Sequence, residues 1–213
     1  MPSDLAFDID CRLRVGDGIR HYHIRSGAAL TSLVGPSGVG KTSLLNCVAG
    51  LARAESGHAI IGGRHLFDMG EGLFLGPEMR GAGYVFQDAR LFPHLRVAAN
   101  LAYGARRKRL SGGPQMLDET AIIALLGIGH LLGRWPATLS GGEIRRVAIG
   151  RALFSRPSFL LLDEPLVSLD PARAEEMAQL IISIRDELRL PILHVSHDRA
   201  EVERLAGEVI EIA

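Results

Sequence analysis

The chain has 213 residues, 47% hydrophobic and 23% charged, so it can bury a full core as one globular unit. Its formal net charge is +0 and no basic stripe is visible, so we expect no nucleic-acid partner. The two cysteines, Cys11 and Cys47, form no C-x-x-C pair, which predicts buried thiols in a reducing compartment. The sequence shows no positively charged leader and no apolar run of membrane-spanning length, which favours the cytosol.

The N-terminal region is predicted to form a small antiparallel β lobe. Residues 7–15 alternate apolar and polar side chains, the period of a strand that buries one face. Further strands are expected around residues 19–24 and 57–61, each beside a glycine-rich turn. Three consecutive residues of the second strand are expected on a solvated face: His21, Tyr22 and His23.

Residues 35–42, Gly-Pro-Ser-Gly-Val-Gly-Lys-Thr, fit the pattern G-x-x-x-x-G-K-[ST] and follow the apolar run 28–34. The pattern predicts a strand, a phosphate-binding loop and a helix. Phosphate oxygens require inward N–H groups, and the three glycines of the loop can take the positive φ that this needs. Lys41 adds a point charge, and the positive end of the helix that starts near Thr42 faces the phosphates. The predicted phosphate site comprises Gly35, Pro36, Ser37, Gly38, Val39, Gly40, Lys41, Thr42 and Ser43.

Three further apolar runs predict buried strands of a parallel sheet, at residues 83–86, 159–162 and 192–195. Each run ends in polar side chains, which are Gln87, then Asp163 and Glu164, then Ser196 and His197. Ligands of open α/β sheets bind outside the carboxyl ends of the strands. We therefore expect these polar residues at the same sheet edge as Lys41.

The chemistry of these side chains suits nucleotide hydrolysis. Asp163 and the Thr42 hydroxyl offer the hard oxygen ligands that Mg²⁺ prefers. Glu164 suits a general base that polarises water. Gln87 can hold either Mg²⁺ or the attacking water.

An inserted helical lobe is predicted between residues 95 and 135, where apolar residues recur at helical spacing. Residues 122–126 belong to such a helix, and Gly127 is its expected C-cap. Residues 106–115 interrupt the lobe with charges, glycine and proline, which predicts an exposed connection.

The tetrapeptide Leu-Ser-Gly-Gly occurs twice, at residues 110–113 and 139–142. Only the second copy precedes a long helix, with Ser140 as a good N-cap, so it predicts a second anion-binding site. The first copy is followed by proline and a polar stretch, and we assign it to a linker.

Together these elements predict an α/β protein with a P-loop NTPase (RecA-like) core, an N-terminal antiparallel β lobe and an inserted helical lobe. We expect residues 1–87 and 156–213 to form the β lobe and catalytic core, and residues 88–155 to form the helical lobe. A helix is expected from Pro171 to about residue 188, and a last strand at residues 209–212.

The order of the motifs resembles the ATP-binding subunits of ABC transporters, and the resemblance covers nearly the whole chain. The motifs are the phosphate loop, Gln87, residues 139–143, residues 162–164, residues 168–170 and His197. The resemblance implies a single ABC-type ATP-binding domain over residues 1–213 that hydrolyses ATP with Mg²⁺. It also implies a homodimer in which each phosphate loop faces residues 139–143 of the other subunit.

The resemblance further implies partners and residue roles. The partners are integral membrane permease subunits, a second ATPase subunit and, indirectly, a substrate-binding protein, with the chain peripheral at the cytoplasmic face of the inner membrane. Catalytic roles fall to Glu164 as base, to His197 as sensor of the γ-phosphate and to Gln87 as link to the permease. Thr42, Gln87 and Asp163 would hold the metal. ATP contacts across the dimer fall to Ser140, Gly141 and Gly142, and Asp170 is a further nucleotide-binding residue.

Residues 83–94, together with the ending Glu143 where Gln is commoner, more narrowly resemble the ATPases of molybdate importers. This implies import of molybdate or tungstate. Those ATPases commonly carry a C-terminal oxyanion-binding domain, whereas this sequence stops after its last strand, so we expect no direct molybdate site. The family usually stacks an aromatic residue of the first hairpin on adenine, but the turn here is Gly-Asp-Gly. We therefore expect weak base recognition, or recognition by Arg14 or Tyr22.

Three alternatives stay open at this point. The chain could power import of another small solute, such as sulfate or thiamine. A soluble ABC-type clamp on nucleic acid or ribosomes would need coiled arms, tandem cassettes or basic surfaces, and none is visible. A P-loop kinase would not require residues 139–143 or a histidine after the last core strand.

Overall fold

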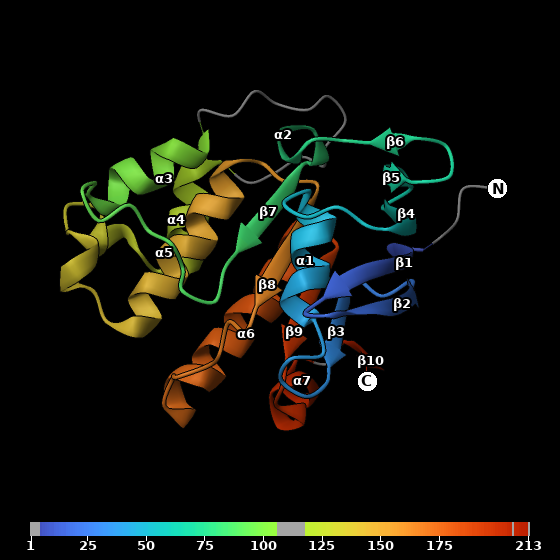
Figure 1. The fold of residues 1–213 in the computed structure, drawn as a ribbon. Helices are drawn as coiled ribbons and strands as arrows, with labels where there is room; N and C mark the ends of the chain where they lie inside the picture. Colours follow the sequence, from blue (N-terminus) through green and yellow to red (C-terminus); the bar gives the residue numbers. More distant parts are fainter. Residues whose placement is uncertain (1–4, 106–117, 206, 213) are drawn as a thin grey trace.

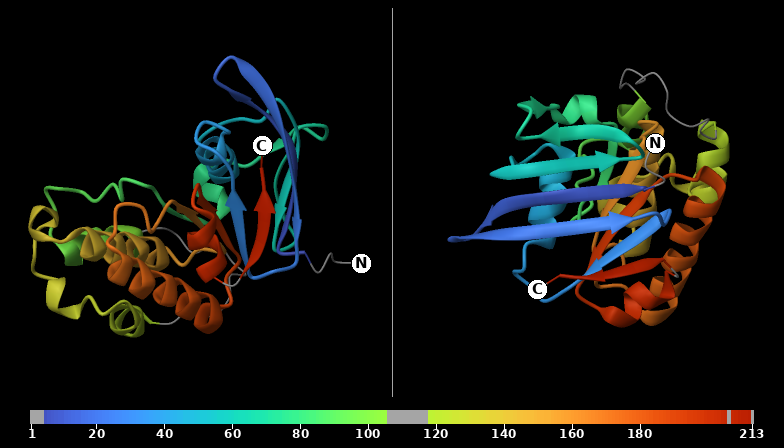
Figure 2. Two further views of the ribbon diagram at one scale, coloured as in Figure 1. Left: turned by 90° about the horizontal axis from the view of Figure 1, so that it is seen from below. Right: turned by 90° about the vertical axis from the view of Figure 1, so that its right-hand side faces the viewer.

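The computed structural model describes residues 5–105, 118–205 and 207–212. They form two five-stranded sheets and a set of helices, and α3, α4, α5 and α6 lie on the side away from the antiparallel sheet (Figures 1 and 2). The antiparallel sheet has the order β2-β1-β4-β5-β6. Its strands are β1 (Phe7–Val15), β2 (Gly18–Ser26), β4 (Ser56–Ile61), β5 (Arg64–Asp68) and β6 (Leu73–Phe74).

The second sheet is parallel, with the order β10-β3-β9-β8-β7. Its strands are β3 (Leu30–Val34), β7 (Ala82–Val85), β8 (Phe159–Asp163), β9 (Ile192–Ser196) and β10 (Glu208–Glu211). Every residue of β3, β8 and β9 is buried, because both faces of the sheet are covered. This confirms the predicted parallel core and brings the ends of these strands to one edge.

One hydrophobic core lies on each face of the parallel sheet. On one face, α1 (Lys41–Ala49) packs between the parallel and antiparallel sheets, with Leu161 and Leu193 beneath it. On the other face, Leu160 and Leu162 pack against the helices. The helices there are α5 (Gly141–Phe154), α6 (Pro171–Leu188) and α7 (Arg199–Arg204).

The predicted helical lobe is present beside β7 (Figure 1). It contains α3 (Val97–Ala105), α4 (Glu119–Leu126), η1 (Gly129–Leu131), η2 (Pro136–Thr138) and α5. Gly127 ends α4 with φ +65°, as its predicted C-cap role requires. The predicted connection at residues 106–115 and the first Leu-Ser-Gly-Gly copy at residues 110–113 lie outside the described residues.

Some elements were not predicted. The structure adds β5 and β6 to the β lobe, and residues 77–80 form a short helix, α2 (Pro77–Arg80). The solvated-face prediction is wrong for Tyr22, which is 2% exposed, because β2 alternates and only its neighbours His21 and His23 point outward. Both histidines bind the exposed carboxylate of Asp10 on β1.

The two cysteines are buried free thiols, as predicted, but they are also neighbours. Cys11 lies on β1 and Cys47 on α1, and both belong to the core between the sheets. The hydrogen bond between them, with burial, raises the pKa of Cys11. The sequence did not predict this contact between Cys11 and Cys47, because the two residues are far apart in the chain and meet only when α1 packs on β1. Among the described residues, no helix is both long enough and apolar enough to cross a membrane.

The close contact of α3 with α5 predicts a stability difference between two glycine substitutions. A Cβ atom at Gly104 would collide with the backbone carbonyl of Arg151 on α5, whereas a Cβ at Gly133 would meet nothing within 4 Å. Gly104→Ala should therefore lower the free energy of unfolding by about 1–3 kcal/mol, the usual cost of overpacking. Gly133→Ala should be close to neutral. Urea unfolding of both variants checks this, and equal stabilities would contradict the described approach of α3 to α5.

Candidate functional site

The phosphate loop connects β3 to α1 and has the backbone that its glycines permit. Gly38 and Gly40 adopt φ of +83° and +92°, as expected. The same expectation is wrong for Gly35, whose φ is not positive. Gly35 is required for another reason, because a Cβ there would collide with the carbonyl of Ile212 beside β10. The loop is thus seated between the end of the chain and the β lobe.

The β lobe supports the loop through Tyr22. Its hydroxyl donates a 2.7 Å hydrogen bond to the Val39 carbonyl, and a Cβ at Gly40 would strike that hydroxyl. Tyr22 is therefore a support of the loop, and the expectation that it stacks on a nucleotide base is wrong, since its ring is buried. Arg14 is exposed and pairs with Glu55 at 3.1 Å. From the first hairpin, Val15 is the residue that lines the nucleotide-sized cavity described below.

Lys41 is 6% exposed and its ammonium group is satisfied within the loop itself. Its Nζ donates to the carbonyls of Gly35 at 2.6 Å and Pro36 at 2.9 Å. A buried charge needs such partners. Phosphate oxygens near the loop would be stronger, charge-assisted acceptors for the same donors.

Glu164 lies between the two other residues predicted to be catalytic. Its Oε2 accepts a 3.3 Å hydrogen bond from Gln87 Nε2, and its Oε1 lies 3.0 Å from His197 Nδ1. The Glu164 backbone has φ +48°, in the left-handed region, and its N–H donates to the Val195 carbonyl of β9 at 3.1 Å. Such strained conformations at non-glycine residues cluster at functional sites. The ends of β7, β8 and β9 thus bring the three side chains together as predicted.

Asp163 and Thr42 form the oxygen-rich corner of this site. Asp163 is 3% exposed, and the Thr42 hydroxyl donates to its Oδ1 at 3.1 Å. Burial raises the pKa of Asp163, and the hydrogen bond from Thr42 opposes that effect. A hydroxyl and a carboxylate this close, with the Gln87 amide nearby, form a donor set that fits Mg²⁺.

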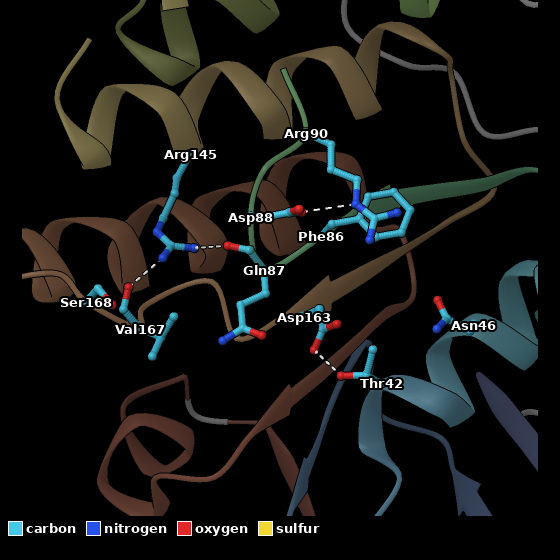
Figure 3. Close-up of a pocket in the computed structure, with 10 residues that line it drawn as sticks. All are labelled: Thr42, Asn46, Phe86, Gln87, Asp88, Arg90, Arg145, Asp163, Val167 and Ser168. Carbon is cyan, nitrogen blue, oxygen red and sulfur yellow. Dashed lines mark hydrogen bonds and ion pairs between the residues drawn. The ribbon is translucent and has the colours of Figure 1, made fainter. Parts of the chain in front are cut away.

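These residues line two neighbouring cavities. The first, of about 490 Å³, is within the usual range for ligand sites. It is lined by Val15, Ser37, Gly38, Gly40, Lys41, Thr42, Ser43, Gln87, Glu164, Val167 and His197. The second, of about 450 Å³, shares Thr42, Gln87 and Val167 with the first (Figure 3). Its other lining residues are Asn46, Phe86, Asp88, Arg90, Arg145, Asp163 and Ser168.

The second predicted anion site lies apart from these cavities. Ser140 caps α5, and a capping box joins its backbone N–H to Glu143 Oε2 at 2.7 Å. Ser140, Gly141 and Gly142 line neither cavity. Asp170 is also absent from both linings, and its carboxylate caps α6 by accepting from the Arg173 N–H. Each chain thus carries a phosphate loop and a separate helix N-terminus that do not meet.

Sequence reasoning missed a buried polar network behind His197. His194 on β9 is fully buried and lies 3.1 Å from the Ser32 hydroxyl and 3.2 Å from Glu201 Oε1. Glu201 on α7 also accepts from Ser196, the residue before His197, at 2.7 Å. The available signal was a histidine inside an apolar strand. Sequence reasoning also missed Arg145, a buried arginine that contacts the backbone carbonyls of Gln87 and Glu164.

Comparisons with known proteins agree on one family. A family profile described as "ABC transporter" matches residues 21–167. The "Molybdenum import ATP-binding protein ModC" of Mesorhizobium japonicum is 51% identical over 205 residues, 96% of this chain and 55% of that protein. The protein of the same name from Brucella abortus is 53% identical over 181 residues, 85% of this chain and 50% of its own. The chain thus spans about half the length of the curated relatives it matches.

Solved structures give the same result. CbiO1 from Clostridium perfringens, described as part of the ABC transporter complex cbiONQ, superimposes with a TM-score of 0.79 at 26% identity. That match covers 99% of this chain and 85% of the other. The dimeric structure of MJ0796, described as a bacterial ABC transporter cassette, gives a TM-score of 0.71 at 25% identity and covers 98% and 93%.

The capping box predicts a pH-dependent contribution of Glu143 to stability. The backbone N–H and the hydroxyl of Ser140, with Arg134 nearby, lower the pKa of Glu143. The pKa of Glu143 in the folded protein thus lies below its value of about 4.3 in the unfolded chain. The stabilisation from ionised Glu143 is therefore fully present above about pH 4.3, and it is lost as the pH falls through the folded pKa. Glu143→Gln should cost about 0.3–1 kcal/mol at pH 7. Urea titrations should show the cost shrinking below about pH 4, and a cost independent of pH would contradict the described ionic contact.

Proposed function

This chain belongs to the ABC transporter family, and we propose that it is the ATP-hydrolysing subunit of an importer for molybdate or tungstate. The observation that carries the ATPase proposal is the position of Glu164, held between Gln87 and His197 in the cavity of the phosphate loop. The cargo proposal rests on identity to ModC proteins over nearly the whole chain. We assign none of the residues that line the two cavities to binding of the oxyanion.

ATP binding is assigned to the phosphate loop. The N–H groups of the loop and the N-terminus of α1 bind the phosphates, and Lys41 Nζ exchanges its carbonyl partners for phosphate oxygens. Thr42, Asp163 and Gln87 would hold Mg²⁺. The metal would supply neutralisation of the phosphate charge.

Hydrolysis is assigned to the group around Glu164. Its carboxylate lines the same cavity as the phosphate loop and can accept a proton from a water aligned on the γ-phosphate. Gln87 and His197 hold the two carboxylate oxygens and so fix the orientation of the base. His197, which directly follows β9, is also the residue that we place nearest the γ-phosphate.

A second copy of the chain completes the ATP site in this proposal. Ser140, Gly141 and Gly142 at the start of α5, with Asp170 of the α6 cap, would contact ATP bound to the partner's loop. Their absence from the cavities of their own chain supports this, as does the dimeric structure of MJ0796. The alternative assignment to kinases gives these residues no role.

A membrane permease is the proposed partner at the second cavity. Beside this cavity, residues 91–93 present Leu91, Phe92 and Pro93, and the Phe92 ring packs 4.6 Å from that of the exposed Tyr103. Apolar side chains gathered next to Gln87 are suited to receive a helix of the permease. Attachment through the permease would place the chain peripherally at the membrane.

Glu164→Gln tests the catalytic assignment. The amide keeps the shape and one hydrogen bond to each neighbour but cannot accept the proton, so steady-state hydrolysis should fall by about 10²-fold or more. Binding of Mg-ATP, measured with a fluorescent analogue, should persist because the phosphate loop and Asp163 are unchanged. Hydrolysis at the wild-type rate would remove Glu164 from the role of base.

Affinity purification from native membranes tests partner and cargo. The wild-type chain should recover a permease encoded with an oxyanion-binding protein, and Phe92→Glu should lose the permease because it puts a charge on the docking surface. Ile19→Glu, which adds the same charge at an exposed apolar residue of β2, is the control and should retain the permease. Recovery of a sulfate or thiamine permease would show that the cargo is not molybdate or tungstate. If Phe92→Glu still recovered the permease, the proposed docking surface would be contradicted.

A further inference from the structure

Arg145 joins the helical lobe to the loops that carry the catalytic residues. It lies on the second turn of α5, and its guanidinium reaches three backbone carbonyls in two loops, the one that follows β7 and the one between β8 and α6. Figure 3 shows its contacts with Gln87 and Val167. Nη1 lies 3.4 Å from the carbonyls of both Gln87 and Glu164. Nη2 donates to the carbonyl of Val167 at 2.5 Å.

Burying the guanidinium of Arg145 costs free energy, so its contacts differ from a chance contact at the surface. The residue is only 9% exposed, and burial lowers the pKa of its guanidinium. Arginine stays protonated even so, and its planar fork can satisfy carbonyls that lie in different directions. A lysine at this position would keep the charge but has a single nitrogen, which cannot reach all three carbonyls.

The three carbonyls belong to the segments that matter for the proposed chemistry. Two come from Gln87 and Glu164 themselves, and the Val167 segment leads to the Asp170 cap of α6. At the start of the same helix α5 lie Ser140 and the two glycines of the second anion site. One side chain therefore connects the backbone of both halves of the proposed ATP site.

We infer that Arg145 is a positioning residue that ties α5 to the backbone of Gln87 and Glu164, so that the geometry of the general base depends on the placement of the helical lobe. This inference rests on the proposed ATPase function. The carbonyls that Arg145 contacts, those of Gln87, Glu164 and Val167, all lie outside the phosphate loop. Its loss should therefore disturb turnover and leave nucleotide affinity in place.

The test compares Arg145→Lys with Arg146→Lys. Arg146 is the next residue of α5, and its guanidinium binds the Leu126 carbonyl and the Glu176 carboxylate, away from the catalytic loops. For each variant, kcat and the Kd for Mg-ATP are measured, with amide hydrogen exchange of residues 86–92 and 164–169 in nucleotide-free protein. Arg145→Met, which removes the charge and keeps an unbranched stem, replaces the lysine variant if that variant does not fold.

We expect Arg145→Lys to lower kcat by about tenfold or more, the scale expected when a catalytic group is displaced. Its Kd should stay within about threefold, and exchange should accelerate in both loops, while Arg146→Lys stays close to wild type in all three. Unchanged kcat and exchange in Arg145→Lys, or equal losses in both variants, would overturn the inference. A wild-type chain that neither bound nor hydrolysed ATP would instead refute the proposed function, and the exchange comparison would still decide whether Arg145 ties the loops.

Discussion

The burial of the parallel strands is the constraint on which the rest of the structure depends. Because β3, β8 and β9 are covered on both faces, polar side chains can enter this sheet freely only where the strands end. The parallel direction places those ends at one edge. The phosphate loop, the Asp163-Glu164 pair and His197 follow from that single arrangement.

The remaining parts of the molecule hold that edge in a defined shape. Tyr22 supports the phosphate loop from the β lobe, and the buried His194-Glu201 pair holds the segment that precedes His197. Arg145 reaches the loops of Gln87 and Glu164 from the helical lobe. Polar and charged groups that are buried without hydrogen-bond partners cost free energy. Each of these side chains therefore keeps its contacts, and so holds the loop it reaches against the element that carries it.

Local sequence patterns could predict the parts of the site that are contiguous in the chain. These parts are the glycine-lysine motif, the apolar runs that end in Gln87 and Glu164, and the Ser140 cap. In each of them, a helix or strand pattern stands directly beside the residues that begin or end that element. Contacts between distant segments could not be predicted, because periodicity shows which face of an element is buried but not what covers it. Tyr22 is an example, since its strand was recognised while its place beneath the loop depends on β-lobe packing. The tight approach of Ile212 to Gly35 is another.

The central claim is that one chain holds half of each ATP site, since its phosphate loop and its α5 N-terminus do not share a cavity. The most direct measurement is the mass of the Glu164→Gln protein by light scattering, with and without saturating Mg-ATP. The account predicts a monomer that doubles in mass with Mg-ATP, and no doubling when Ser140→Arg is added, because the arginine fills the place of the γ-phosphate. A protein that stays monomeric with bound ATP, or that doubles regardless of Ser140, would contradict it.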